Sequence, residues 1–293
     1  MRGVARMNEP MAAHNTWRAG GAARRYFEPA DAADLGAFLG RLPEDEPLLW
    51  LGLGSNLLVR DGGWPGAVIA ARNLNCMEWL DATTVRAEAG VPCGKLARAA
   101  ARKGLVGGEF LAGIPGTVGG ALAMNAGAWG GETWTYVLSV ETVDRRGVRR
   151  RRNADAFAIG YRSVRGRTPG MDQEGFLSGV FRFAPGDAET AQGRIKRLLA
   201  ERAEKQPTGL PSCGSVFRNP AGDHAARLIE ACGLKGYRVG GARVSPKHAN
   251  FIINENHATA ADIESLLIHT QDIVEAAFGV RLEPEARIVG DVA

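Results

Sequence analysis

The chain has 293 residues, of which 45% are hydrophobic and 23% charged, and its formal net charge is +4 at pH 7. This length predicts about two domains of roughly 150 residues each, and the composition excludes long disordered segments and disulfide-stabilised miniproteins. The positive charge is too small for a chain of this size to demand a nucleic-acid partner.

The cysteines and the start of the chain indicate the compartment. Cys76, Cys93, Cys213 and Cys232 include no C-x-x-C pair, and the five histidines are scattered. We therefore expect neither a disulfide framework nor a metal site, and a reducing cytoplasm is the default. The basic N-terminus is not followed by an apolar segment, so no secretory signal is expected.

Residues 111–131 form an uncharged stretch of 21 residues, which is long enough to cross a bilayer. Seven glycines, Pro115 and Asn125 interrupt it. Because these residues are typical of loops rather than of a spanning helix, we expect no membrane insertion.

The first half of the chain shows alternating strand and turn signals. Leu48, Leu49, Trp50 and Leu51 predict a short buried strand, and residues 61–63 predict a turn before a second strand over 67–70. The alanine-rich residues 94–103 predict a helix.

The middle of the chain shows further strand signals and then a long helix. Strands are expected over residues 135–143 and 176–183, with an arginine-rich turn and run at 145–147 and 149–152 that favours a solvated hairpin over a phosphate contact. A helix over 188–205 follows the break at 184–187, where we place the domain boundary.

Beyond that boundary we expect a turn-rich loop at 207–220, a helix ended by Gly233 and a strand over 248–254. Thr259 and Asp262 then predict a capping box for a helix ended by Gly279, and residues 280–290 predict a last strand. The apolar stripe expected on that helix consists of Ile263, Leu266, Leu267, Ile273, Val274, Ala277 and Phe278.

Glycine is the unusual feature of the composition. The chain has 39 glycines, about 13% of its residues against a usual value near 7%, and they concentrate in residues 52–66 and 104–131. The first segment is no dinucleotide fingerprint, because Leu57 stands where the sixth position requires glycine. Its backbone N–H groups could hold an anion, although a tight turn is the favoured explanation when the segment is taken alone.

The second glycine segment changes that balance. An uncharged loop of this length must either leave backbone groups at the surface or wrap a ligand that satisfies them. The two segments together therefore indicate an extended dinucleotide such as FAD.

Seven segments, in this order along the chain, resemble the successive motifs of the MurB family, the UDP-N-acetylenolpyruvoylglucosamine reductases. They are residues 15–21, 51–66, 107–132, 161–164, 211–222, 225–254 and 282–290. The resemblance implies an α+β fold, with a PCMH-type FAD-binding domain of two α+β subdomains in residues 1–185. A smaller α+β substrate-binding domain would follow in residues 186–293, with its last strand returning to the flavin site. The short interval after residues 161–164 resembles the type II branch.

The resemblance also implies an activity. The chain would hold FAD non-covalently and use NADPH to reduce UDP-N-acetylglucosamine enolpyruvate to UDP-N-acetylmuramate, a cytoplasmic step of peptidoglycan biosynthesis. We expect no nucleic-acid partner, and a monomer is favoured.

Three residues match the family's catalytic positions. Ser215 matches the proton donor, which would protonate the carbanion left after hydride transfer. Arg162 and Glu285 match the pair that stabilises this intermediate, Arg162 by holding the substrate carboxylate. Glu285 would be protonated there, or would act through water or a neighbouring group. Outside the family frame, the three would be an ordinary loop hydroxyl, a surface charge and an ion-pair partner of Arg287.

The motifs also predict binding residues. The cofactor would contact Gly52, Gly54, Ser55, Asn56, Leu57, Gly113, Ile114, Pro115, Gly116, Gly119, Gly120, Asn125, Gly127 and Arg287. The uridine diphosphate portion would contact Tyr161, Arg218, Asn219, Lys247 and His248, since cations and amides suit a diphosphate. A structural role for His248 is supported equally well, and Cys213 is expected to be a buried thiol without a catalytic role.

Two alternatives remain open. The first is a flavin-dependent oxidase of small alcohols or hydroxy acids on the same cofactor fold. The second is a non-catalytic nucleotide- or RNA-binding module led by residues 145–152, which predicts a colourless protein with salt-dependent nucleic-acid affinity.

Overall fold

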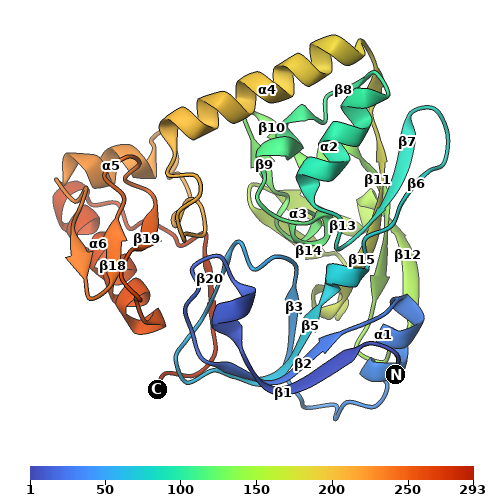
Figure 1. The fold of residues 1–293 in the computed structure, drawn as a ribbon, viewed down its shortest axis with the longest axis horizontal. Coiled ribbons are helices and arrows are strands. Elements are labelled where there is room, and N and C mark those ends of the chain that lie inside the picture. Colours follow the sequence, from blue (N-terminus) through green and yellow to red (C-terminus); the bar gives the residue numbers. More distant parts are fainter. The chain divides into compact units, whose positions relative to one another are not determined.

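The computed structural model describes all residues, 1–293 (Figure 1). They form two compact units. Unit 1 consists of Met1–Arg6, Tyr26–Leu53 and Val68–Glu201, and unit 2 consists of Met7–Arg25, Gly54–Ala67 and Arg202–Ala293. Strands β1 (Val4–Pro10), β2 (Ala22–Glu28) and β5 (Trp64–Ala70) contribute residues to both units and join β3 (Leu48–Leu51) in a sheet of order β1-β2-β5-β3. The predicted strand at residues 48–51 is confirmed.

Unit 1 is built on a five-stranded antiparallel sheet of order β12-β11-β15-β7-β6. Its strands are β6 (Met77–Trp79), β7 (Thr84–Glu88), β11 (Val137–Val143), β12 (Arg149–Asn153) and β15 (Gly175–Arg182). The expected strands at residues 135–143 and 176–183 are confirmed with shifted ends, and the expected hairpin at the arginine run is formed by β11 and β12.

Helices complete the core of unit 1. Helix α2 (Cys93–Arg102) buries Leu96, Ala97 and Ala100, and α3 (Val118–Met124) packs against β15. The remaining elements are α1 (Ala32–Leu39), β8 (Leu105–Val106), β9 (Gly127–Ala128), β10 (Gly131–Glu132), β13 (Phe157–Gly160), β14 (Ser163–Gly166), β16 (Ala184–Pro185) and most of α4 (Ala188–Lys205).

The second glycine segment is not the continuous loop that its composition predicts. Residues Glu109–Gly113 form a 3-10 turn, α3 follows, and β9 and β10 pair as a hairpin. Leu111, Val118 and Leu122 are buried in the core. The apolar residues between the glycines are thus part of the core and help to order the segment. No helix of the structure is long and apolar enough to span a membrane.

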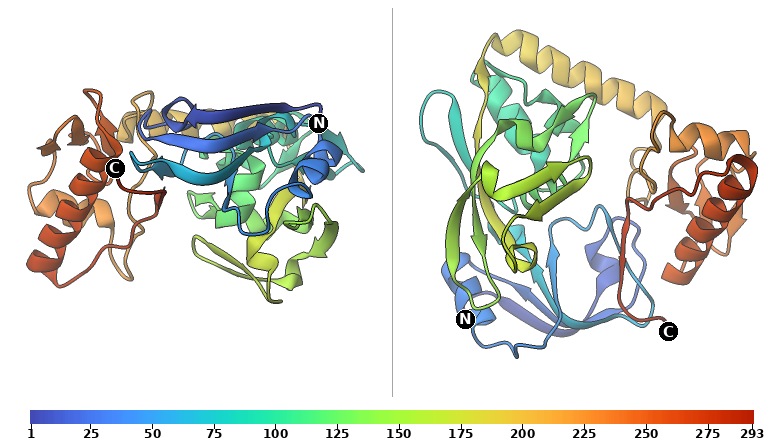
Figure 2. Two further views of the ribbon diagram at one scale, coloured as in Figure 1. Left: turned by 90° about the horizontal axis from the view of Figure 1, so that it is seen from below. Right: turned by 180° about the vertical axis from the view of Figure 1, so that it is seen from behind.

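Unit 2 combines a three-stranded antiparallel sheet with two helices. Strands β17 (Arg238–Val239), β18 (Ala242–Val244) and β19 (Ile252–Asn254) pack against α6 (Ala260–Phe278), as Figure 2 shows from two further directions. Helix α5 (Ala225–Ala231) also contacts α6, and β4 (Leu57–Val59) pairs in parallel with β20 (Arg287–Val289).

The predicted ends of α6 are confirmed. Thr259 and Asp262 form the capping box, and Gly279 ends the helix with a φ of 67°. The carboxylate of Asp61 additionally accepts hydrogen bonds from the N–H groups of Ala260 and Ala261.

Two expectations for unit 2 were wrong in part. Ile273, Ala277 and Phe278 of the predicted stripe are exposed, because Thr270 and Gln271 occupy the buried face of α6 and Gln271 donates to Leu282 O. The expected strand at residues 280–290 is regular only in β20, because Pro284 has no N–H to continue a ladder and forms only an isolated bridge with Phe217. The assignment of FAD to residues 1–185 and of substrate to 186–293 concerns ligands and stays a prediction.

Candidate active site

Ser215 and Glu285 lie on two backbone segments that pair within unit 2. Phe217 and Pro284 form an antiparallel bridge, in which Glu285 N donates to Val216 O at 2.8 Å and Arg218 N donates to Glu283 O at 2.9 Å. Ser215 directly precedes Val216, so this pairing brings together two residues that are 70 positions apart in the sequence.

The first glycine segment joins the same arrangement through Asn56. Asn56 Nδ2 donates to Glu285 O at 2.9 Å, and Arg287 N donates to Asn56 O at 3.0 Å. The parallel pairing of β4 and β20 then sets Leu57 opposite Arg287. The predicted cofactor residues Asn56, Leu57 and Arg287 therefore lie next to the predicted catalytic residue Glu285.

Gly54 shows why this segment needs glycine. Its φ is +66°, and a Cβ atom there would lie 2.0 Å from His14 O. Thr16 N donates to Gly54 O at 3.2 Å, so the N-terminal motif supports the turn that leads to Ser55 and Asn56. A side chain at residue 54 would have to displace this backbone.

Cys213 is buried next to the catalytic candidates. Burial, followed by the charge of Glu285, raises the pKa of the Cys213 thiol well above its ordinary value. The thiol is therefore protonated and unreactive at neutral pH, as the sequence predicts for a buried cysteine.

Arg162 belongs to unit 1, where the backbone fixes it in an uncommon conformation. Its φ is +52°, its Nη2 donates to Gly127 O at 2.9 Å, and its guanidinium carbon lies 5.1 Å from the ring centroid of Tyr161. A positive φ is strained for a bulky residue, and it persists only where the surrounding structure imposes it. Tyr161 is 48% exposed, so its ring is accessible to solvent.

Asn125 connects the second glycine segment to the neighbourhood of Arg162. It is fully buried with a φ of +45°, its Nδ2 donates to Glu132 Oε2 and to Gly160 O, and its Oδ1 accepts from Trp134 N. The predicted contact of Asn125 with the cofactor stays a prediction, and its amide already has three protein partners.

The backbone around α3 has fewer free donors than the glycine content implies. Val118 N donates to Val91 O, and Gly119 N donates to Ala89 O, each at 2.8 Å. A Cβ atom on Gly119 would lie 2.8 Å from Ala89 Cβ, so close packing explains this glycine. Gly120, by contrast, is exposed with open space beside it.

The other predicted cofactor residues of this segment also differ in how closely the protein packs around them. A Cβ atom on Gly113 would lie 2.2 Å from the indole of Trp129, and Gly116 O accepts from Cys93 N. Ile114 is half-buried and Pro115 exposed.

The residues predicted to hold uridine diphosphate all lie in unit 2 except Tyr161. Arg218 forms an ion pair with Glu283 at 3.5 Å, and Lys247 Nζ donates to Ala203 O at 2.6 Å. Asn219 Oδ1 accepts from Ala225 N at the start of α5. These contacts keep the side chains in defined places, and their binding role stays a prediction.

His248 is half-buried, and its ring packs edge-on against Phe251 at 4.8 Å. Burial, followed by the charge of Lys235, lowers the pKa of His248 below 6.5. The imidazole is therefore neutral at pH 7 and brings no positive charge to a diphosphate.

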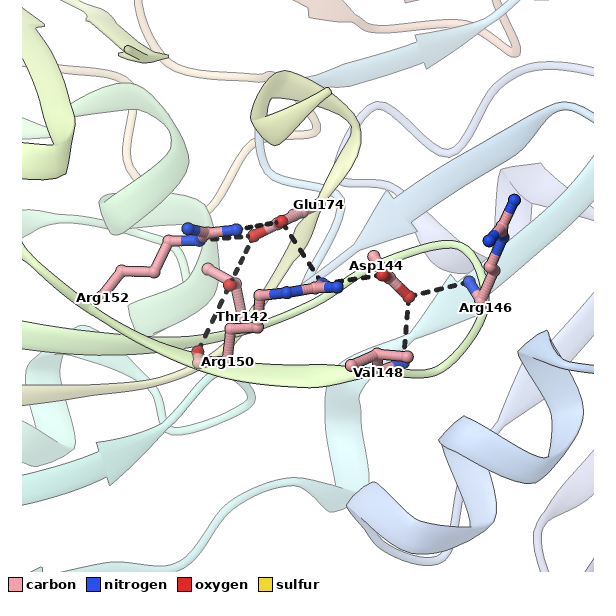
Figure 3. A network of polar contacts seen from close by, with 7 residues as sticks. All are labelled: Thr142, Asp144, Arg146, Val148, Arg150, Arg152 and Glu174. Atoms are coloured by element: carbon pink, nitrogen blue, oxygen red, sulfur yellow. Dashed lines mark hydrogen bonds and ion pairs between the residues drawn. The ribbon is translucent and has the colours of Figure 1, made fainter. Parts of the chain in front are cut away.

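The arginine run forms ion pairs with Asp144 of its own hairpin and with Glu174, which directly precedes β15 (Figure 3). Arg152 donates to both carboxylate oxygens of Glu174, Arg150 contacts Asp144 at 2.7 Å and Glu174 at 3.8 Å, and Thr142 Oγ1 donates to Glu174 at 2.6 Å. These arginines are neutralised by neighbouring carboxylates, which favours the solvated hairpin over a nucleic-acid contact.

Comparisons with known proteins agree with this geometry. A model of the FAD binding domain matches residues 23–151, and a model of the UDP-N-acetylenolpyruvoylglucosamine reductase C-terminal domain matches residues 206–289. The reductase of that name from Alkalilimnicola ehrlichii is 59% identical over 97% of this chain and 94% of its own, and that from Methylococcus capsulatus is 55% identical over 99% and 94%. The chain belongs to the MurB family.

A solved structure extends this result to the fold. The crystal structure of MurB from Thermus caldophilus superposes with a TM-score of 0.82 at 32% identity, covering 98% of this chain and 99% of the other. The predicted MurB resemblance and the α+β fold, with an FAD-binding domain ahead of a C-terminal domain, are confirmed. The chain is a FAD-containing oxidoreductase of peptidoglycan synthesis, which decides against both alternatives.

One buried hydroxyl of this chain suits a bound FAD and was not predicted from the sequence. Thr117 is 2% exposed, and its Oγ1 is buried without a hydrogen-bond partner. A Cβ atom on Gly52 would lie 2.5 Å from this oxygen, so the hydroxyl lies where the two glycine segments meet in unit 1. A buried hydroxyl without a partner is costly unless a ligand satisfies it. The only signal in the sequence is a hydroxyl inside an uncharged segment.

Proposed function

We propose that this chain reduces UDP-N-acetylglucosamine enolpyruvate to UDP-N-acetylmuramate, with NADPH as the electron source and with non-covalently bound FAD. The observation that carries the proposal is the pairing of the Ser215 and Glu285 segments in unit 2 of a chain whose two halves match the family models. Bound FAD would supply hydride transfer, from NADPH to the methylene carbon of the enolpyruvyl group.

Ser215 would complete the reduction by donating a proton. Addition of a hydride to the methylene carbon leaves negative charge on the adjacent carbon and on the carboxylate. A serine hydroxyl is a weak acid, but this carbanion is a base strong enough to take its proton. General-acid assistance of this kind contributes about 10²- to 10⁴-fold in rate.

Arg162 and Glu285 would stabilise the intermediate before protonation. The guanidinium of Arg162 can hold the substrate carboxylate as it gains charge, and its fixed conformation is the kind of preorganisation that such stabilisation requires. Glu285 would act as a neutral acid, or through water or a neighbouring group.

The substrate's diphosphate would be held by cations and amides. Arg218 and Lys247 supply positive charge, and Asn219, Tyr161 and neutral His248 supply polar contacts. In this scheme residues 1–185 form the FAD-binding domain, which also supplies Tyr161 and Arg162 to the substrate. Residues 186–293 form the substrate-binding domain, whose last strand supplies Arg287 to the flavin. We also propose that the protein is a monomer and that it lies in the cytoplasm. The four free cysteines support the second point, because disulfides are rare in that reducing compartment.

The test is a turnover assay of the purified protein with enolpyruvyl-UDP-N-acetylglucosamine and NADPH. The protein should be yellow, NADPH should bleach its visible absorption anaerobically, and addition of the enolpyruvyl substrate should restore it. Failure to consume NADPH with this substrate, together with oxidation of a small alcohol, would contradict the proposal.

A further inference from the structure

We propose that Asn250 is a positioning residue that holds the Ser215 segment against the Glu285 segment. This inference rests on the proposed function, because it concerns the placement of the same proton donor. It assigns Asn250 no contact with substrate or cofactor, only with the backbone next to Ser215.

Asn250 makes three hydrogen bonds to this backbone while only 3% exposed. Its main-chain O accepts from Val216 N at 2.9 Å, its side-chain Oδ1 accepts from Phe217 N at 3.0 Å, and its Nδ2 donates to Phe217 O at 2.9 Å. Both backbone groups of Phe217 are therefore satisfied by one amide, as a neighbouring strand would satisfy them.

The opposite edge of the same segment pairs with the Glu285 segment. Val216 O accepts from Glu285 N at 2.8 Å, and Arg218 N donates to Glu283 O at 2.9 Å. The short segment that follows Ser215 is thus held on one edge by Asn250 and on the other by residues 283–285. Loss of the Asn250 amide would leave only one of these edges fixed.

Asn250 is itself fixed by the turn that precedes β19. Phe251 N donates to His248 O at 3.1 Å, Ser245 N donates to Phe251 O at 2.8 Å, and Ser245 Oγ accepts from the N–H groups of Lys247 and His248. Ser245 is fully buried. A side chain mounted on such a turn can set the position of another segment, because it has little freedom of its own.

The function of this arrangement follows from what proton transfer requires. A general acid must lie within hydrogen-bond reach of the carbon that it protonates, and a misplacement of about 1 Å can cost about 10²-fold in rate. Reduction of the flavin by NADPH needs no proton from Ser215. Loss of the Asn250 amide should therefore affect one half of the catalytic cycle only.

The experiment measures the two half-reactions separately in holoenzyme by anaerobic stopped-flow absorbance. Asn250→Ala should slow reoxidation of the reduced protein by enolpyruvyl-UDP-N-acetylglucosamine by about 10- to 100-fold, and should leave the rate of reduction by NADPH and the flavin content unchanged.

The chain offers a matched control in Asn254. Its Nδ2 donates to Trp17 O at 2.8 Å and its Oδ1 accepts from Ala258 N at 2.8 Å, so it is also an amide that bridges two backbone groups. Asn254→Ala should lower thermal stability to a similar extent as Asn250→Ala, and both of its half-reactions should keep their wild-type rates.

A second variant, Asn250→Asp, tests the hydrogen bonds themselves. A carboxylate still accepts from Phe217 N, but only the protonated acid can donate to Phe217 O. Burial raises the pKa of a carboxyl group. The ratio of the variant's reoxidation rate to that of the wild type should therefore increase as pH is lowered through this pKa.

Each outcome is decisive for one proposal. A wild-type reoxidation rate in Asn250→Ala, or equal slowing of both half-reactions, would overturn the positioning role while the proposed function stands. A pH-independent ratio in Asn250→Asp would overturn it even if Asn250→Ala does not fold. No reoxidation of the wild type by this substrate would refute the proposed function itself, and the positioning role with it.

Discussion

At the scale of single residues, Ser215 and Glu285 are positioned by hydrogen bonds of the backbone around them. The bonds from Glu285 N to Val216 O and from Asn56 Nδ2 to Glu285 O join segments that are remote in the sequence. A serine has a short side chain, so its position follows its backbone closely. Replacing a single side chain here should therefore change the rate of a catalytic step without unfolding the protein.

Ser215→Ala should leave flavin reduction by NADPH almost intact, because that step needs no proton from this residue. Reoxidation by the enolpyruvyl substrate should slow by about 10²-fold or more, which is roughly 2.7 kcal/mol of barrier. Stopped-flow absorbance of the flavin measures both rates.

Ser212→Ala is the control for Ser215→Ala, because it removes a hydroxyl from the same segment. Its two rates should match the wild type. Equal slowing of both half-reactions in Ser215→Ala would show that Ser215 supports the fold rather than the proton transfer.

Thr117→Val should weaken FAD binding without weakening the fold. The substitution removes a buried hydroxyl that has no protein partner, so the free energy of unfolding of the flavin-free protein should not fall. Loss of one hydrogen bond to FAD should cost about 1 kcal/mol, or roughly 5-fold in affinity. Titration of flavin-free protein with FAD measures this.

Thr133→Val is the contrasting variant, because Thr133 Oγ1 donates to Ala126 O at 2.6 Å. It should lower the stability of the flavin-free protein. Unchanged FAD affinity in Thr117→Val would place the flavin away from this hydroxyl.

At the scale of elements, the β11–β12 hairpin shows that the charges of an arginine-rich strand can be balanced by carboxylates of the same sheet. Glu174 precedes β15, and Arg152 and Arg150 lie on β12, so the network joins the two strands that flank β11 in the sheet (Figure 3). The Glu174 side chain is 7% exposed, which makes these contacts stronger than those of a surface pair.

This network makes stability depend on pH on the acid side. Burial raises the pKa of Glu174, but hydrogen bonds from Arg152 and Thr142 and the charges of Arg152 and Arg150 outweigh it, and the net pKa lies below 4.5. A carboxyl whose pKa is lowered on folding contributes stability above its unfolded pKa and loses that contribution as pH falls through its folded pKa.

Glu174→Gln should therefore destabilise the protein by about 2 kcal/mol at pH 7, and the difference from the wild type should shrink at pH values below the folded pKa. Urea unfolding at several pH values measures it. Glu78→Gln, at an exposed position of β6, is the control. A difference that stays constant down to acid pH would contradict the assigned ion pair.

At the scale of the whole molecule, each unit has its own hydrophobic core. One core is built around Leu96, Leu122 and Phe181 in unit 1, and the other around Phe217, Ile263 and Leu266 in unit 2. Each unit therefore has the buried apolar surface that a stable domain requires, and the cofactor adds to this stability through binding.

FAD should raise the thermal midpoint of the flavin-free protein, because a ligand that binds only the folded state stabilises it. The gain is about 2.7 kcal/mol when free FAD is 100 times its Kd. Riboflavin is the control, since it lacks the pyrophosphate that the glycine segments are proposed to hold, and it should raise the midpoint less. Equal midpoints with and without FAD would contradict the assigned cofactor.

The sequence by itself determined the features that depend on local patterns or on ordered motifs. The capping box and glycine end of α6, the hairpin at the arginine run and the strand at Leu48–Leu51 each follow from a few neighbouring residues. Seven motifs in family order predicted the fold, the flavin and the reductase class, because such an order is not produced by composition alone.

Tertiary structure decided what each glycine and each amide does. Close contacts explain two of the glycines, because a Cβ atom on Gly119 would meet Ala89 and one on Gly52 would meet the hydroxyl of Thr117. The pattern of α6 could not reveal that Gln271 is buried, because its partner Leu282 O comes from a later segment. Asn250 gave no signal in the sequence, because its importance lies in hydrogen bonds to Phe217, 33 residues away. Contacts between distant segments are formed only when the chain folds, and no local pattern encodes them.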